Sequence, residues 1–158
     1  NLAQVIRDAT VLQRVSTSEI DIDVDVSKAD FVFMFDRRLI TQAVTNLVKN
    51  ASEAIDGRAL TENLEKGHVE VVAGIEHDVP FIRVTDNGVG LPKENRNRLA
   101  EPYMTTREKG TGLGLAIVKR IMEEHGGLLR LQDAPSAKGA QVTLEFSRLP
   151  EPLLISAE

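Results

Sequence analysis

The chain has 158 residues, of which 42% are hydrophobic and 27% charged, as expected for one globular domain with a single core. It contains no cysteine, which excludes disulfides, thiolate metal sites and cysteine nucleophiles. The formal net charge of −5 disfavours non-specific nucleic-acid binding, and no apolar run approaches the roughly 20 residues that a membrane-spanning helix needs.

The first third of the chain predicts two strands between two helices. Apolar residues recur at helical spacing over residues 2–15, and residues 20–26 alternate as a strand does. The solvated face of that strand carries Asp21, Asp23 and Asp25. A calcium loop is the less favoured alternative for these carboxylates, because the glycine and later glutamate of an EF-hand are absent. Residues 31–35 predict a short apolar strand, and Asp36 predicts the N-cap of a helix that ends near residue 56.

The middle of the chain predicts a hairpin followed by a glycine-rich loop. Residues 57–67 are polar and indicate a loop. Two strands are expected at residues 69–75 and 81–85, joined by a turn at residues 77–80. The glycine-rich loop covers residues 86–92.

The last third predicts a helix and a second hairpin. A short helix at residues 93–100 precedes a polar, irregular and mobile segment at residues 101–110. The next helix covers residues 113–125 and ends at Gly126. Two final strands are expected at residues 128–132 and 141–146, with a turn near residues 135–139.

These elements predict an α/β (α+β) two-layer sandwich. Because most strands arrive as hairpins, we expect a mixed, mostly antiparallel sheet with the helices on one face. Residues 1–149 form the domain, and residues 150–158 form a loosely held, flexible tail. The motifs described next all fall beside the groove that such a helical layer leaves at the loops.

Asn46 and Asn50 lie one turn apart on the same face of the predicted helix. Their amide oxygens suit Mg²⁺, which prefers oxygen ligands and shares its shell with water and phosphates. The alternative is that both amides hydrogen-bond to a neighbouring loop.

Asp86 follows a strand and begins the sequence DNGVG. A carboxylate at this point accepts a hydrogen bond from an exocyclic amine such as that of adenine. Gly88 and Gly90 let the backbone pass close to a flat base. The alternative is a tight turn, for which Asp-Asn-Gly is common chemistry.

The sequence GTGLGL at residues 110–115 leads into a helix. Backbone amides and the positive end of the helix dipole favour phosphate there, and a flexible joint is the alternative. The motif is neither a Walker loop nor the dinucleotide fingerprint. Arg107 and Lys109 precede it and either reach phosphates or remain solvated charges. His68, His77 and His125 are assigned no catalytic role, and a cation at His125 would suit the helix end.

Taken in order, these segments resemble the ATP-binding catalytic domain of bacterial sensor histidine kinases. That domain belongs to the superfamily of gyrase, heat-shock chaperone, histidine kinase and mismatch-repair proteins, which has the Bergerat-type fold. NLVKNA at residues 46–51 resembles the N box, DNGVG the G1 box, EPYMTTR at residues 101–107 the F box and lid, and GTGLGL the G2 box. The nitrogen-regulation type of sensor is the most similar subfamily, judged from KNASEA at residues 49–54 and the lid threonines.

The resemblance implies a role for each motif residue. Asp86 would bind the adenine amino group, with Gly88 and Gly90 lining the base. Asn50, helped by Asn46, would hold Mg²⁺. The phosphates would be lined by the lid and G2 residues, which are Arg107, Lys109, Gly110, Thr111, Gly112, Leu113 and Gly114.

Two departures from the family pattern matter. Members that hydrolyse ATP carry a general-base glutamate where this chain has Asn46, and an amide cannot take a proton from water at neutral pH. Phosphoryl transfer is therefore favoured over an ATP-hydrolysing clamp of the gyrase type or a non-catalytic nucleotide sensor. In the F box, Tyr103 and Met104 replace the usual phenylalanines, which would alter how the lid is anchored.

The phosphate-accepting histidine of the family has a context that no histidine here shares. The resemblance therefore implies that the acceptor lies outside this chain, on a helical dimerisation domain of the same parent protein, which then serves a response regulator. It also implies a cytoplasmic, monomeric fragment that binds no nucleic acid, and a parent that is an inner-membrane sensor. The absence of an initial methionine agrees with a piece of a longer protein.

Overall fold

The computed structural model describes residues 1–16, 19–29, 33–58, 65–92, 114–135 and 138–148. Within these residues the chain forms three helices and five strands. In chain order they are α1 (Leu2–Ser16), β1 (Ile20–Asp25), α2 (Arg37–Asp56), β2 (Gly67–Glu76), β3 (Val79–Asp86), α3 (Gly114–Glu124), β4 (Leu128–Asp133) and β5 (Ala140–Glu145).

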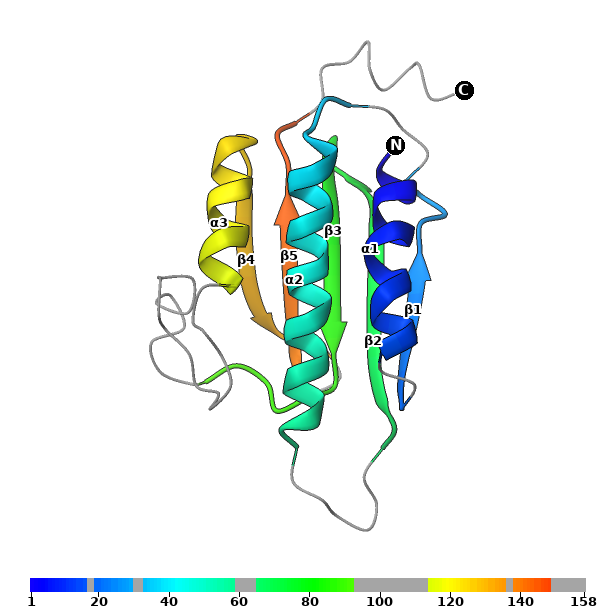
Figure 1. Cartoon of the computed structure of the whole chain (residues 1–158). Helices are drawn as coiled ribbons and strands as arrows, with labels where there is room; N and C mark the ends of the chain where they lie inside the picture. Colours follow the sequence, from blue (N-terminus) through cyan, green and yellow to red (C-terminus); the bar gives the residue numbers. More distant parts are fainter. Residues whose placement is uncertain (17–18, 30–32, 59–64, 93–113, 136–137, 149–158) are drawn as a thin grey trace.

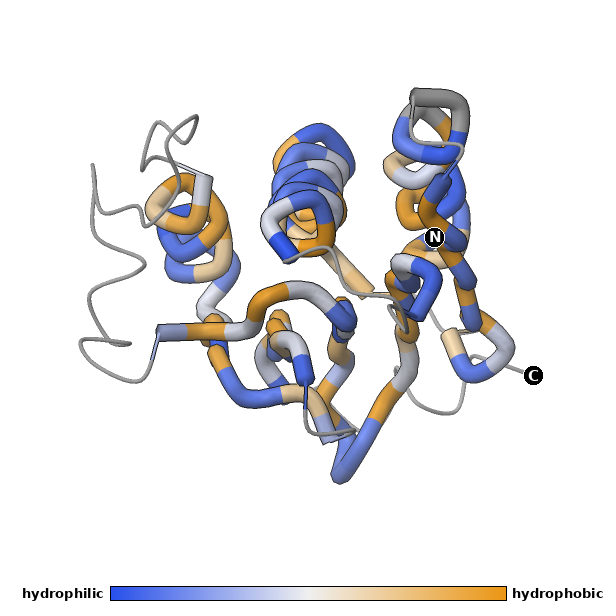
Figure 2. Tube along the Cα trace, turned by 90° about the horizontal axis from the view of Figure 1, so that it is seen from below, coloured by the Kyte–Doolittle hydropathy of each residue, from blue (hydrophilic) through white to orange (hydrophobic). Residues whose placement is uncertain are grey.

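The strands form one sheet in the order β1-β2-β3-β5-β4. β1 pairs with β2 in parallel, and the other three pairings are antiparallel. The three helices cover one face of this sheet, which gives two layers (Figures 1 and 2). The predicted two-layer sandwich with a mixed, mostly antiparallel sheet is therefore confirmed.

The core lies between the helices and one face of the sheet, and strand alternation selects the residues that enter it. In β3, Ile82 and Val84 are buried in the core cluster, whereas the alternate residues Arg83 and Thr85 point to the helix-free face. α2 occupies the middle of the helical layer and buries nine residues on one stripe (Figure 1). Its N-terminus confirms the expected cap, because the Asp36 side chain accepts a hydrogen bond from the Leu39 N–H at 3.1 Å.

The apolar strand predicted at residues 31–35 is wrong over its described part, since Phe33 to Phe35 form no strand. Their rings pack on one another instead. The Phe33 ring lies 5.0 Å from that of Phe35 and 4.9 Å from that of Phe146, which follows β5. Phe33 and Phe35 thus cover the end of the core beside the start of α2, whereas Met34 between them is exposed.

The first hairpin turns more tightly than its sequence indicates. His77 and Asp78 have φ angles of +52° and +66°, which complete the reversal in two residues. Glu76 then pairs with Val79, so Val79 and Pro80 belong to β3 and not to the predicted turn.

The second half of the sheet follows the prediction closely. α3 ends at Glu124, and Gly126 with φ +68° terminates it. The Gly127 N–H donates to the Met122 carbonyl and the Gly126 N–H to the Glu123 carbonyl, which is a Schellman motif. The predicted short helix, the lid segment and the C-terminal tail lie outside the described residues. Among the helices that are described, none has the length and apolarity that crossing a membrane requires.

Candidate nucleotide-binding site

Asp86 ends β3 with its side chain on the helical side of the sheet, in step with Ile82 and Val84. The residue is only 7% exposed. Its Oδ1 accepts hydrogen bonds from the backbone N–H of Gly88 at 2.9 Å and of Ala140 at 3.3 Å. Two amide dipoles aimed at one oxygen compensate for burial of the carboxylate and fix its orientation.

The loop after Asp86 packs directly against α2. The Val89 N–H donates to the Ala54 carbonyl at 3.1 Å. A Cβ added to Gly88 would lie 2.5 Å from the Ala54 carbonyl carbon and 2.7 Å from its oxygen. Only glycine allows this approach, so Gly88 places the loop that follows β3 at the lower end of α2 (Figure 1).

Asn50 lies one turn before Ala54 on α2, beside the first residue of α3. A Cβ on Gly114 would lie 3.5 Å from both the Oδ1 and the Nδ2 of Asn50. Asn46 is half-buried one turn further from the loop. The structure therefore brings Asp86, Gly88, Asn50 and Gly114 together at one end of the helical layer.

The turn before β5 supports this site from the sheet side, and sequence reasoning assigned it no role. Gly139 has φ +103°, and a Cβ there would overlap the Asp86 carbonyl oxygen. Gly90, with φ +81°, stands next to Gly139, where an added Cβ would lie 3.4 Å from the Gly139 carbonyl oxygen. The only sequence signal was a glycine directly before a strand, which is also ordinary turn chemistry.

Six of the predicted site residues lie outside the described part of the chain. They are Arg107, Lys109, Gly110, Thr111, Gly112 and Leu113. The F-box residues Tyr103 and Met104 lie outside it too.

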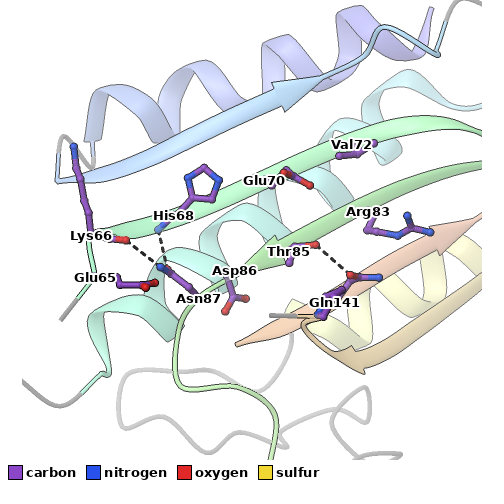
Figure 3. Close-up of a pocket in the computed structure, with 11 residues that line it drawn as sticks. Glu65, Lys66, His68, Glu70, Val72, Arg83, Thr85, Asp86, Asn87 and Gln141 are labelled. Atoms are coloured by element: carbon purple, nitrogen blue, oxygen red, sulfur yellow. Dashed lines mark hydrogen bonds between the residues drawn. The ribbon is translucent and has the colours of Figure 1, made fainter. Parts of the chain in front are cut away.

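A shallow cavity of about 570 Å³ opens on the other face of the sheet, away from the helices (Figure 3). Its walls include the outward side chains of β2 and β3, among them Glu70, Arg83 and Thr85. Asn87 borders it while fastening the loop to β2: its Oδ1 accepts from the His68 N–H at 2.8 Å, and its Nδ2 donates to the Lys66 carbonyl at 3.0 Å. Asp86 also borders this cavity, whereas the motif residues Asn50 and Gly114 lie on the helical side and do not line it.

Residues 35–151 match the family model described as histidine kinase-, DNA gyrase B- and HSP90-like ATPase. The chain belongs to this family. The match includes α2, the loop after β3, α3 and the turn before β5, which are the elements that meet at Asp86 and Asn50.

Individual relatives place this ATPase-family chain among the sensor histidine kinases. It is 49% identical over 145 residues to nitrogen regulation protein NtrY of Azorhizobium caulinodans, covering 91% of this chain and 18% of that protein. It is 30% identical to sporulation kinase A of Bacillus subtilis over 94% of this chain and 23% of that protein. The catalytic domain of histidine kinase ThkA superposes with a TM-score of 0.77 at 29% identity, covering 95% of this chain and 96% of that structure.

These comparisons confirm the predicted family and fold class. The chain is an ATP-binding catalytic domain of the histidine kinase type. It spans about a fifth of the length of the curated relatives it matches.

Proposed function

We propose that the domain binds ATP with its adenine amino group donating to the carboxylate of Asp86. The observation that carries this assignment is the pair of backbone N–H groups on Oδ1 of Asp86, because they fix the orientation of a buried carboxyl group at the end of a strand. A fixed acceptor selects a base that presents an amino group over one that presents a carbonyl oxygen at that position. Gly88 and Gly90 would line the flat face of the base.

The amide oxygen of Asn50, with that of Asn46, would hold Mg²⁺ beside the phosphates. The donor chemistry fits, since Mg²⁺ prefers oxygen ligands and few protein groups, and a neutral amide adds no charge beside a triphosphate. The bound metal would neutralise charge on the phosphate oxygens. Gly114 begins α3 beside Asn50, so the amides of residues 110–114 and the helix dipole would face the same phosphates.

Arg107, Lys109, Thr111 and Leu113 would complete the phosphate side of the site, with Gly110, Gly112 and Gly114 as hinges. The cationic side chains would stabilise the charge that spreads over the transferred group. These assignments come from the resemblance of residues 101–115 to the lid and G2 box.

We infer that the γ-phosphate passes to a histidine on a separate helical domain of the parent protein. The accepting imidazole nitrogen forms the new P–N bond, and the bond from phosphorus to the ADP oxygen breaks. Asn46 cannot act as a general base toward water, which favours transfer over hydrolysis. His125 is a poor acceptor because both ring nitrogens already make hydrogen bonds. The phosphorylated domain would then serve a response regulator, with the catalytic domain on the cytoplasmic side of the membrane.

Calorimetric titration with a non-hydrolysable ATP analogue tests the binding step, with and without Mg²⁺. We expect measurable heat of binding and a higher affinity with Mg²⁺ than without it. The absence of heat in both conditions would contradict the proposal.

Radiolabelled ATP tests the transfer step when the domain is mixed with the histidine-bearing domain of the same parent. Label should move to that domain and not to this chain, and steady phosphate release by this chain alone would favour the gyrase-type alternative.

Replacing Asn50 with alanine is expected to abolish the gain in affinity that Mg²⁺ gives. Removing one ligand oxygen should weaken binding in Mg²⁺ by about 10-fold, or ~1.4 kcal/mol, and leave the weaker metal-free affinity nearly unchanged. Gln42→Ala is the matched control, because it removes an exposed amide from the same helix about 12 Å away along the axis. Equal losses with and without Mg²⁺ would contradict the assignment of Asn50 to the metal.

A further inference from the structure

His125 joins the last turn of α3 to the first turn of α2. Its Nε2 lies 3.0 Å from the backbone nitrogen of Asp36, and its Nδ1 lies 2.7 Å from the carbonyl oxygen of Ile121. The ring also stands edge-on to Phe146, with 6.3 Å between the centroids and 85° between the planes. One side chain therefore links two helices and the end of β5.

The two hydrogen bonds determine which nitrogen carries the proton. A backbone N–H can only donate, so Nε2 must offer its lone pair to Asp36. A carbonyl oxygen can only accept, so Nδ1 must carry the hydrogen that reaches Ile121. His125 is thus the neutral Nδ1–H tautomer, and the cation that sequence alone suggested at this helix end is incompatible with the bond to Asp36.

The bond to Asp36 completes a helix cap that α2 cannot complete by itself. In a capping box, the N-cap side chain accepts from the third helical residue, whose own side chain accepts from the N-cap N–H. Here Asp36 accepts from the Leu39 N–H, but leucine has no acceptor to return. The side chain of His125, at the end of α3, accepts the hydrogen bond from the Asp36 N–H instead.

This cap lies at the opposite end of the helices from the candidate nucleotide-binding site. At about 1.5 Å rise per residue, Asn50 lies about 21 Å along α2 from Asp36, and Gly114 about 17 Å along α3 from His125. Asn50 and Gly114 meet at the far end. The two helices are therefore antiparallel and joined at both ends, so a change in the register of α3 at His125 moves Gly114 relative to Asn50.

We propose that His125 is a positioning residue for ATP binding, because its bridge to Asp36 sets the place of the α3 N-terminus beside Asn50. The proposal rests on the proposed function, in which Asn50 holds Mg²⁺ and the first turn of α3 faces the phosphates. No contact between His125 and the nucleotide is required. Its effect passes along α3, which is otherwise anchored by the buried side chains of Val118, Ile121 and Met122.

Two amide variants distinguish the hydrogen bond between His125 and Asp36 from the one between His125 and Ile121. The amide of glutamine reaches about as far as Nε2 and can accept from Asp36, whereas that of asparagine reaches about as far as Nδ1 and can bond only within α3. We expect His125→Asn to weaken binding of the Mg²⁺ complex of a non-hydrolysable ATP analogue by about threefold to tenfold. His125→Gln should stay within twofold of the wild type. Equal affinities for the two variants, or losses that follow their thermal stabilities, would overturn the proposal.

Nuclear magnetic resonance provides a test that needs no nucleotide. Nitrogen shifts of the ring should identify the Nδ1–H tautomer, with a scalar coupling across the hydrogen bond between the Asp36 amide nitrogen and Nε2. The side-chain amide signals of Asn50 and the backbone amide of Gly114 should move in His125→Asn and not in His125→Gln. An Nε2–H tautomer, or unmoved signals at both residues, would overturn the inference. A wild-type domain that binds no nucleotide while these signals move would instead count against the proposed function alone.

Discussion

Replacing Asp86 with asparagine is expected to weaken binding of an adenine nucleotide by about 100-fold, or ~2.7 kcal/mol. The asparagine oxygen can still accept from the Gly88 and Ala140 N–H groups that now bond to Oδ1. Its NH₂ group would then take the place of the second carboxylate oxygen. A donor would face the amino group of adenine, so the variant loses a hydrogen bond to a charged acceptor and gains a repulsion. Calorimetric titration of wild type and variant measures the effect.

The matched control for this change is Asp78→Asn. Asp78 is an exposed aspartate in the first hairpin, and its φ of +66° suits asparagine well. The Asp78→Asn substitution removes the same charge as Asp86→Asn and should leave nucleotide affinity unchanged. The thermal midpoint of Asp86→Asn should stay near that of the wild type, because both backbone hydrogen bonds survive. An Asp86→Asn domain that is folded and binds ATP as tightly as the wild type would remove the assigned role.

Replacing Gly88 with alanine should abolish nucleotide binding and destabilise the fold by about 2–3 kcal/mol. The new methyl group would lie 2.5 Å from the carbonyl carbon of Ala54, and helix backbone cannot move aside as a side chain can. The loop must leave α2, which breaks the Val89 to Ala54 hydrogen bond and shifts the Gly88 N–H away from Asp86. Chemical denaturation and titration measure the two effects separately.

Gly57→Ala is the control for this second change, because it adds the same methyl group in the same region. A Cβ on Gly57 would meet Val89 at 3.5 Å, an ordinary contact, and the backbone there has φ −78°. Its stability and affinity should match the wild type. Adding Ala54→Gly to Gly88→Ala should not restore binding, since the backbone atoms of residue 54 remain in the way. Recovery in that double variant would show that the side chain of Ala54, and not its backbone, sets the limit.

Local sequence signals predicted the elements whose causes are local. Asp36 caps α2 through a contact three residues away, and the apolar stripe of that helix repeats at helical spacing. The reversal at Gly126 likewise depends on hydrogen bonds within the last turn of α3. Such features can be read from a window of a few residues, because the partners lie inside it.

The sequence did not predict the features whose partners lie far along the chain. Phe33 resembles a strand residue until its contact with Phe146 is known. Gly139 resembles any turn glycine until it is placed against the Asp86 carbonyl. The helix dipole alone favours a cation at His125, whereas the hydrogen bond from the Asp36 N–H needs a lone pair on Nε2. The order of the motifs predicted that Asp86 and Asn50 would share a site, but which atoms orient the carboxylate came only from the fold.

The hydrogen bond from Ala140 to Asp86 has a consequence for how the domain matures. The acceptor carboxylate precedes its donor by 54 residues, and the donor begins the last strand. As the chain emerges from the ribosome, Asp86 is synthesised long before the amide that helps to orient it. A growing chain that ends before β5 therefore lacks one of the two N–H donors of Asp86, and under the proposed function it would bind ATP fully only after the final strand docks.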